Sequence, residues 1–230
     1  MKKIFILTCI SIFGVSGILK AQFTGKQYIG GEAAVNFNNS DLNNDRSVNN
    51  YGYNFDISLG KFQSETRATG WNLSTSLSGA KNFYQLDDTG IPIERKGINR
   101  VGVGVGRFWQ FYKHFNNNVG IFAGPGVNLG FSASKELDNQ GGTFFYDVKR
   151  NQINLSLGLA AGVYYKFSDK WWATASLAFA NPISVEYVFA KYKALSNIDA
   201  GFKRNELKYQ FNPGINLPSV GLGVRYFYNR

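Results

Sequence analysis

Residues 153–167, which read INLSLGLAAGVYYKF, decide the fold of this chain. Every odd-numbered residue is apolar, from Ile153 to Phe167, whereas the even-numbered residues are mainly Asn, Ser, Gly and Ala. Because successive side chains of a strand point to opposite faces, this alternation predicts a β-strand with one apolar face. A helix would spread the same apolar residues around its circumference, and Gly158 and Gly162 would weaken it.

The length of this strand and its second face indicate a membrane. The strand has 15 residues, whereas most strands have about 5–6. At about 3.3 Å per residue it spans roughly 50 Å. A soluble sheet would carry charged residues on its second face, whereas this strand carries small residues that suit a crowded interior. We therefore expect bulky side chains to face lipid and small ones to fill a narrow barrel lumen. Coordinates with Leu155 and Leu157 gathered at the centre would overturn this expectation.

The composition agrees with one large all-β domain or two small ones. The chain has 230 residues, 26 of them glycine, and no run of about 20 apolar residues that would predict a membrane helix. Its formal charge of +10 invites a nucleic-acid interpretation. Its cations are dispersed, however, and no run of five basic residues occurs. We therefore expect no nucleic-acid partner, since a binding patch needs clustered cations.

The N-terminus has the pattern of a secretory signal. Lys2 and Lys3 precede an apolar segment, residues 4–19, and Ala21 stands before the expected cleavage at Gln22. Residues 1–21 are therefore predicted to be a signal peptide and residues 22–230 the barrel domain. The single cysteine, Cys9, lies in the leader, so we expect the mature chain to have no disulfide.

Eight strands are predicted, and their connections alternate between short and long. The expected strands are residues 28–37, 51–62, 70–80, 98–112, 119–133, 153–167, 171–180 and 217–228. Short turns at one end and long loops at the other, including the predicted excursion 181–216, are typical of outer-membrane barrels. Aromatic residues near the strand ends predict a lower girdle at the membrane interface: Phe62, Trp71, Trp109, Phe111, Tyr112, Phe167, Trp171, Trp172, Tyr226 and Tyr228.

Over residues 22–230 the pattern resembles the small eight-stranded OmpA/OmpX-like outer-membrane barrels of Gram-negative bacteria. The fold class implied is an all-β, eight-stranded antiparallel up-and-down transmembrane barrel, located in the outer membrane. The final strand is similar to the signal read by the barrel-assembly machinery, which the resemblance implies as a partner during insertion; the matching residues are Ser219, Gly221, Val224 and Tyr226. Such signals usually end on an aromatic residue, whereas Asn229 and Arg230 follow Tyr228 here.

No motif in the chain predicts catalysis. Its glycine clusters do not complete a dinucleotide-binding fingerprint, and residues 88–90, Asp-Thr-Gly, occur once where aspartic proteases need two carboxylates. The only histidine, His114, lies in a predicted periplasmic turn without an evident serine partner. We therefore expect no enzyme, no cofactor and no metal site.

Several charged residues are predicted to point into the lumen, where an unpaired charge is costly. The expected lumen ion network consists of Glu32, Asp56, Arg100, Lys166 and Arg225, with the direction of Arg107 left open. The network would either plug the barrel or gate a small pore. Eight strands leave an interior just wide enough for side chains, and three predicted inward rings would narrow it further: Phe122, Tyr164 and Phe227. This favours the plug.

The excursion 181–216 is rich in aromatic and basic residues. Its predicted interaction patch comprises Tyr187, Tyr192, Lys193, Lys203, Arg204 and Tyr209. In one interpretation the strands of the excursion extend beyond the membrane as a hairpin sheet, whose edge or patch would contact an extracellular or envelope protein. The residues would otherwise contact lipopolysaccharide phosphates or merely cover the barrel mouth. The expected function is thus a non-enzymatic integral outer-membrane barrel, surrounded by outer-membrane lipid and lipopolysaccharide, with a structural or surface-interaction role. The alternatives are a narrow conduit for small or apolar molecules and, third, a soluble calycin-like carrier.

Overall fold

The computed structural model describes residues 23–42, 46–85, 92–139, 145–194, 201–212 and 220–228. These residues form nine strands, all paired antiparallel. The strands are β1 (Gln27–Leu42), β2 (Arg46–Ser64), β3 (Arg67–Gln85), β4 (Pro92–His114), β5 (Val119–Asn139), β6 (Phe145–Lys166), β7 (Trp171–Ala194), β8 (Gly201–Phe211) and β9 (Val220–Tyr228). Within the described residues, no helix has the length and apolar character needed to cross a membrane.

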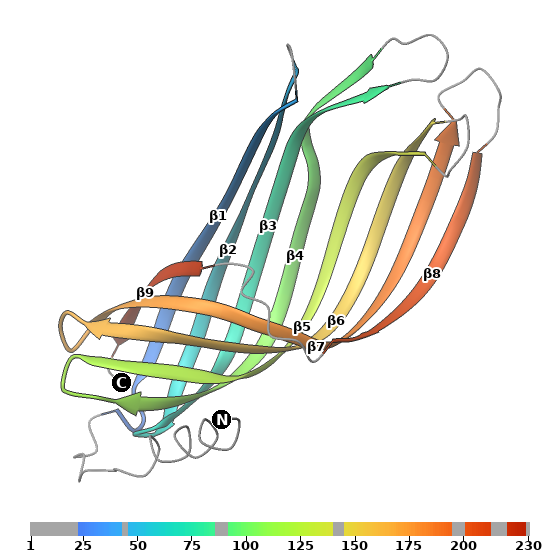
Figure 1. Cartoon of the computed structure of the whole chain (residues 1–230). Coiled ribbons are helices and arrows are strands. Elements are labelled where there is room, and N and C mark those ends of the chain that lie inside the picture. Colours follow the sequence, from blue (N-terminus) through green and yellow to red (C-terminus); the bar gives the residue numbers. More distant parts are fainter. Residues whose placement is uncertain are drawn as a thin grey trace, which may run out of the picture.

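Eight of these strands close into a ring (Figure 1). Strands β1 to β7 pair in sequence, and β9 joins β7 to β1. Both β8 and β9 run antiparallel to β7, with β8 against residues 183–193 and β9 against residues 171–177. The two strands thus occupy successive parts of the same edge of β7, where a regular barrel would have one strand. This ring confirms the predicted eight-stranded up-and-down barrel.

The distribution of side chains matches a transmembrane wall. On β6, Leu155 and Leu159 are 49% and 46% exposed on the outside. From the other face of the same strand, Asn154 lines a cavity of the lumen and Tyr164 is 3% exposed. The bulky-out, small-in arrangement predicted for residues 153–167 is therefore confirmed. A closed barrel with an apolar outer band is the architecture of an integral outer-membrane protein.

Much of the predicted excursion 181–216 is strand, as the expected extension of its strands into a hairpin sheet requires. Strand β7 continues through Asn181 and Pro182 to Ala194, and β8 follows. Proline has no N–H for a strand ladder, and facing this segment the register between β6 and β7 shifts on both sides of Leu159. The irregular register thus accommodates Pro182 in the strand. At the same place, the neighbour of β7 changes from β9 to β8.

Beyond the ring, the outer half of the wall divides into two arms (Figure 1). Pairing of β4 with β5 ends at Arg100 and Ser134, and pairing of β1 with β9 ends at Ala33 and Leu222. Among the described strands, β8 pairs with β7 alone. We call the outer parts of β1–β4 the first arm, and the outer parts of β5, β6 and β7 together with β8 the second arm. The short turns lie at the opposite, periplasmic end, as is usual for such barrels.

Candidate functional site

A cluster of inward aromatic rings closes the periplasmic end of the lumen. We call this cluster the aromatic plug; its members are Phe23, Tyr28, Phe62, Tyr112, Phe122, Tyr164, Trp172 and Phe227. Each of these side chains is 7% exposed or less. The Trp172 ring lies 4.5 Å from both the Tyr164 and Phe227 rings, measured between centroids. Rings at such separations gain energy beyond the burial of their area.

Glycines make room for these rings. A Cβ atom built on Gly60 would overlap the ring of Tyr28, and one built on Gly162 would overlap the ring of Phe122. A side chain at either position would overpack the lumen. The alternation of glycine with bulky residues therefore serves the plug as well as the strand.

The plug encloses one charged group. Arg225 is 6% exposed, and its guanidinium lies 4.9 Å from the centre of the Tyr28 ring and 4.7 Å from that of Phe122. The guanidinium also donates a hydrogen bond to the Tyr112 hydroxyl. Cation–π contacts and a hydrogen bond together offset the cost of burying this charge.

His114 and residues 23–26, which precede β1, pack against the plug at its periplasmic side. His114 Nε2 donates to the carbonyl oxygen of Glu65 at 2.8 Å, and in this tautomer the Tyr164 hydroxyl donates to Nδ1. The backbone N–H of Phe23 donates to the Glu65 carboxylate at 2.8 Å. His114 therefore ends β4 and packs on the plug rather than standing in a turn as predicted.

Above the plug lies a small chamber with a volume of about 290 Å³. Glu32, Asp56 and Arg225 line it together with Ser176, whose hydroxyl donates to the Glu32 carboxylate. The short contacts of Glu32 and Arg225 are thus with neutral hydroxyl groups.

A larger polar cavity of about 460 Å³ occupies the outer half of the lumen. Arg100 donates to Ser132 at 3.2 Å and to Gln152 at 3.3 Å, and Asn154 donates to the Glu186 carboxylate at 3.2 Å. Its other lining residues are mainly Asn, Ser and Gly. This half of the lumen offers a wettable surface rather than a packed core.

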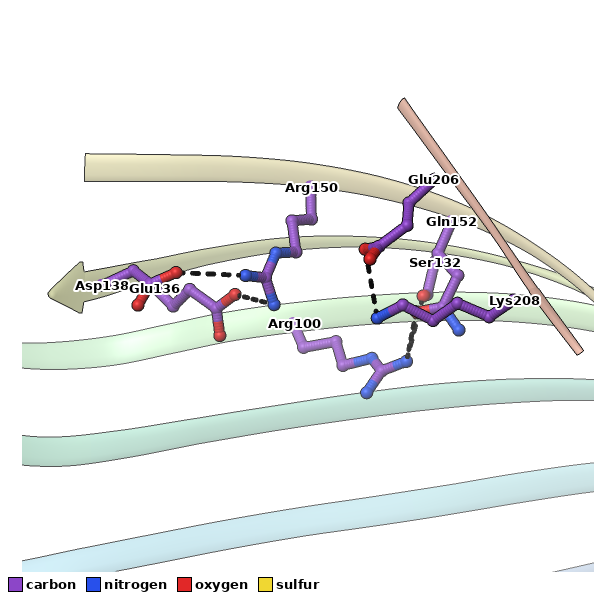
Figure 2. A network of polar contacts seen from close by, with 8 residues as sticks. All are labelled: Arg100, Ser132, Glu136, Asp138, Arg150, Gln152, Glu206 and Lys208. Atoms are coloured by element: carbon purple, nitrogen blue, oxygen red, sulfur yellow. Dashed lines mark hydrogen bonds and ion pairs between the residues drawn. The ribbon is translucent and has the colours of Figure 1, made fainter. Parts of the chain in front are cut away.

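Ion pairs continue this polar lining onto the inner face of the second arm (Figure 2). Arg150 pairs with Glu136 at 2.6 Å and with Asp138 at 3.3 Å. Glu206 bridges Arg204 at 3.0 Å and Lys208 at 3.3 Å. Acids and bases are therefore matched on this face.

The structure divides the predicted lumen network among three places. Glu32, Asp56 and Arg225 share the small chamber, whereas Arg100 lies in the outer cavity. Lys166 pairs with Asp169 of the following turn at 2.8 Å. That hydrogen bond and the ammonium charge lower the pKa of the exposed Asp169 carboxyl. Arg107, whose direction was left open, lies over the exposed Trp71 ring, 5.1 Å from its centre.

Three residues predicted for the lower girdle instead belong to the plug: Phe62, Tyr112 and Trp172. Grouping rings by their closeness to a strand end disregards the face on which each ring stands. Trp171 and Phe111, which neighbour two of these residues in sequence, are 49% and 50% exposed on the outside as expected.

The residues of the predicted interaction patch stand on both faces of the β7–β8 hairpin and so do not form one surface. Tyr192 is 2% exposed and stacks on the Phe202 ring at 4.3 Å. Arg204 shares the inner face through its pair with Glu206. The remaining members have exposed side chains: Tyr187, Lys193, Lys203 and Tyr209.

The residues of the predicted assembly signal lie in or just before β9. Gly221 is buried, and a Cβ at this position would overlap the Glu32 carboxylate. Val224 is 48% exposed on the outside, and the Tyr226 ring lies 4.8 Å from the Trp171 ring. Ser219 lies outside the described residues.

Comparison of the fold with solved structures finds outer-membrane proteins. OprG from Pseudomonas aeruginosa has 12% identity and a TM-score of 0.44, with 92% of this chain and 100% of OprG covered. A major outer membrane protein from Thermus thermophilus has 13% identity and a TM-score of 0.40, covering 88% and 99%. Neisserial surface protein A has 13% identity and a TM-score of 0.39, covering 89% and 98%. No protein-family model and no curated protein sequence matches the chain. The chain is thus similar to these proteins in fold, and its place in the outer membrane follows from its own barrel geometry.

Proposed function

We propose that this chain is a non-enzymatic outer-membrane barrel that is closed to solutes at its periplasmic end and acts at the cell surface through its outer arms. The observation that carries the proposal is the aromatic plug. Its rings fill the lumen from wall to wall, and Phe62 and Trp172 are 0% and 1% exposed. A narrow barrel filled in this way has no aqueous path. Its polar and charged groups lie mainly in the outer cavity and the arms.

Conductance in planar lipid bilayers tests this proposal. The native barrel should show no stepwise openings, because the plug excludes water and ions. The double variant Phe62→Ala and Trp172→Ala removes two central rings and should produce openings. The matched control is Phe111→Ala with Trp171→Ala, which removes two outward rings from the same end and should stay silent. Steady conductance of the native barrel would contradict the proposal.

A second candidate function, a lateral conduit for small molecules, is favoured by the unpaired strand edges. Beyond Ala33, the edge of β1 that faces away from β2 has no partner among the described residues, and neither has the edge of β8 that faces away from β7. Such edges are costly in lipid. Asn36 of β1 and Glu186 of β7 line the outer cavity close to these edges. A small solute could pass there between the cavity and the membrane without crossing the plug.

Binding of a fluorescent small solute by the barrel tests whether the outer cavity serves as a lateral conduit. A lateral conduit predicts saturable binding by protein in vesicles, with loss of binding in Asn36→Trp, which fills the cavity beside β1. Binding that is unchanged by Asn36→Trp would contradict a lateral route. The conductance experiment is independent of this result, because the plug lies below the cavity.

A further inference from the structure

Four lysines stand side by side on the outward face of the second arm. The strand registers align them across β5, β6, β7 and β8: Lys135, Lys149, Lys191 and Lys203. All four side chains are exposed. With neighbouring strands about 4.8 Å apart, this lysine row is roughly 14 Å wide.

The lysine row lies just beyond the apolar band of the wall. Four residues along each strand toward the membrane, the same registers align a row of outward apolar side chains: Phe131, Ile153, Tyr187 and Leu207. These are 36–50% exposed on the lipid side. Four residues correspond to about 13 Å along a strand. The lysines therefore reach the headgroup layer of the outer leaflet, where long cationic side chains are favoured.

Within the described residues, no ion pair balances the cations of the lysine row. Like charges directly opposite one another destabilise a sheet. The ion pairs of the described second arm join other residues, Arg150 with Glu136 and Asp138 and Glu206 with Arg204 and Lys208. Figure 2 shows all of these side chains except Arg204, on the inner face. The nearest carboxylate on the outward face in these registers is Asp147, which stands opposite Lys193. Anions that bind from outside the chain would therefore stabilise the row.

A cleft at one end of the row gives such an anion a place. Where β4 and β5 part, a cleft of about 330 Å³ is lined by Lys96, Lys135 and Lys149. Each of the strands β4, β5 and β6 thus contributes one lysine to the lining of this cleft. Of the two carboxylates in its lining, Glu136 is engaged by Arg150 at 2.6 Å, which leaves Asp147 against three lysines.

We propose that the lysine row, with Lys96 across the cleft, binds the phosphate groups of phosphorylated lipid headgroups in the outer leaflet. Ammonium groups form strong charge-assisted hydrogen bonds to phosphate. The depth of the row favours a lipid over a soluble polyanion, since the latter would have to enter the headgroup layer. The inference rests on the proposed function, because it requires the second arm to stand at the outer surface of the membrane.

Titration of bisphosphorylated lipid A into the folded barrel in neutral detergent tests the inference. The native barrel should bind this lipid and should bind dephosphorylated lipid A much more weakly. The double variant Lys149→Gln and Lys191→Gln removes the two central charges and keeps most of the side-chain length. At about fivefold per lysine, the loss of affinity for the two lysines together should be roughly 25-fold. The matched control, Lys61→Gln with Lys170→Gln, makes the same charge change at the periplasmic end and should leave the affinity unchanged.

Thermal unfolding provides a second test, in which the double variant and the native barrel should change their order of stability when the lipid is added. Without phosphorylated lipid, the double variant should unfold at the same or a higher temperature than the native barrel, because repulsion across the row is relieved. With bisphosphorylated lipid A present, the native barrel should become the more stable of the two. A lower unfolding temperature of the variant without lipid would show a structural role and overturn the inference.

Two further outcomes would also overturn the inference: equal affinity of the native barrel and the double variant, or equally tight binding of a soluble sulfated oligosaccharide at the row. None of these outcomes bears on the proposed closure, which is read from conductance. Conversely, a conducting native barrel would overturn the closure and leave the lipid titration unchanged.

Discussion

The periplasmic and outer halves of this barrel fill the same lumen by different means. At the periplasmic end the inner face carries rings, and one charge, Arg225, is enclosed among them. In the outer half the inner face carries hydroxyl, amide and ionic groups around a cavity of about 460 Å³. Packed rings exclude water and resist rearrangement, whereas exposed ion pairs contribute little energy and tolerate change. We therefore expect stability to be concentrated at the periplasmic end, whereas the proposed surface role would depend on the outer end.

The largest effect is expected from removing the central ring of the plug. Trp172→Ala should lower the free energy of unfolding by about 3–5 kcal/mol, because it leaves a cavity among buried rings. Urea unfolding in lipid vesicles, followed by intrinsic fluorescence, measures this change. The neighbouring Trp171 is 49% exposed to lipid, and Trp171→Ala should cost much less. Equal losses in the two variants would contradict the assignment of stability to the plug.

A second substitution at Trp172 separates the contribution of its ring from that of its indole N–H. Its N–H is buried and has no hydrogen-bond partner among the described residues. Trp172→Phe removes that unsatisfied donor while keeping a ring in place, so the loss of volume is partly offset. Its cost should therefore be well below that of Trp172→Ala in the same unfolding experiment.

An intermediate effect is expected at the enclosed charge. Tyr112→Phe deletes the hydroxyl that accepts from Arg225 and should cost about 1.5–3 kcal/mol, because a buried guanidinium loses its hydrogen bond. Adding Arg225→Met to this variant should recover much of the loss, since a hydrophobic side chain of similar length needs no partner. Unfolding free energies of the two single variants and the double variant complete the cycle. Additive losses would show that the two groups do not interact.

The faces of the barrel were predictable from sequence because a two-residue period is a local property. The alternation in residues 153–167 placed Leu155 outside and Tyr164 inside, as the structure shows. The same rule applied to β4 would have separated Tyr112 from Phe111, and so would have revealed more of the plug.

The lysine row, in contrast, was not predictable from any single strand. Lys135, Lys149 and Lys191 become neighbours only through the registers of three long strands. Register depends on turn geometry and on the pairing of whole faces. Between β6 and β7 it also shifts on both sides of Leu159, which the sequence does not reveal. For the same reason, the division of the lumen charges among separate chambers could not be foreseen.

The smallest effect is expected at the ion pairs of the outer half. Arg150 and Glu136 are 35% and 40% exposed, so solvent screens their attraction even at 2.6 Å. Arg150→Gln should therefore change the free energy of unfolding by less than about 1 kcal/mol, and added salt should reduce the difference further. Hydrogen exchange should rise locally in the second arm and stay unchanged around the plug, because the ion pairs of Arg150 lie within the second arm. A loss as large as that of Trp172→Ala would show that the outer half also carries the stability of the barrel, and the contrast between the two ends would fail.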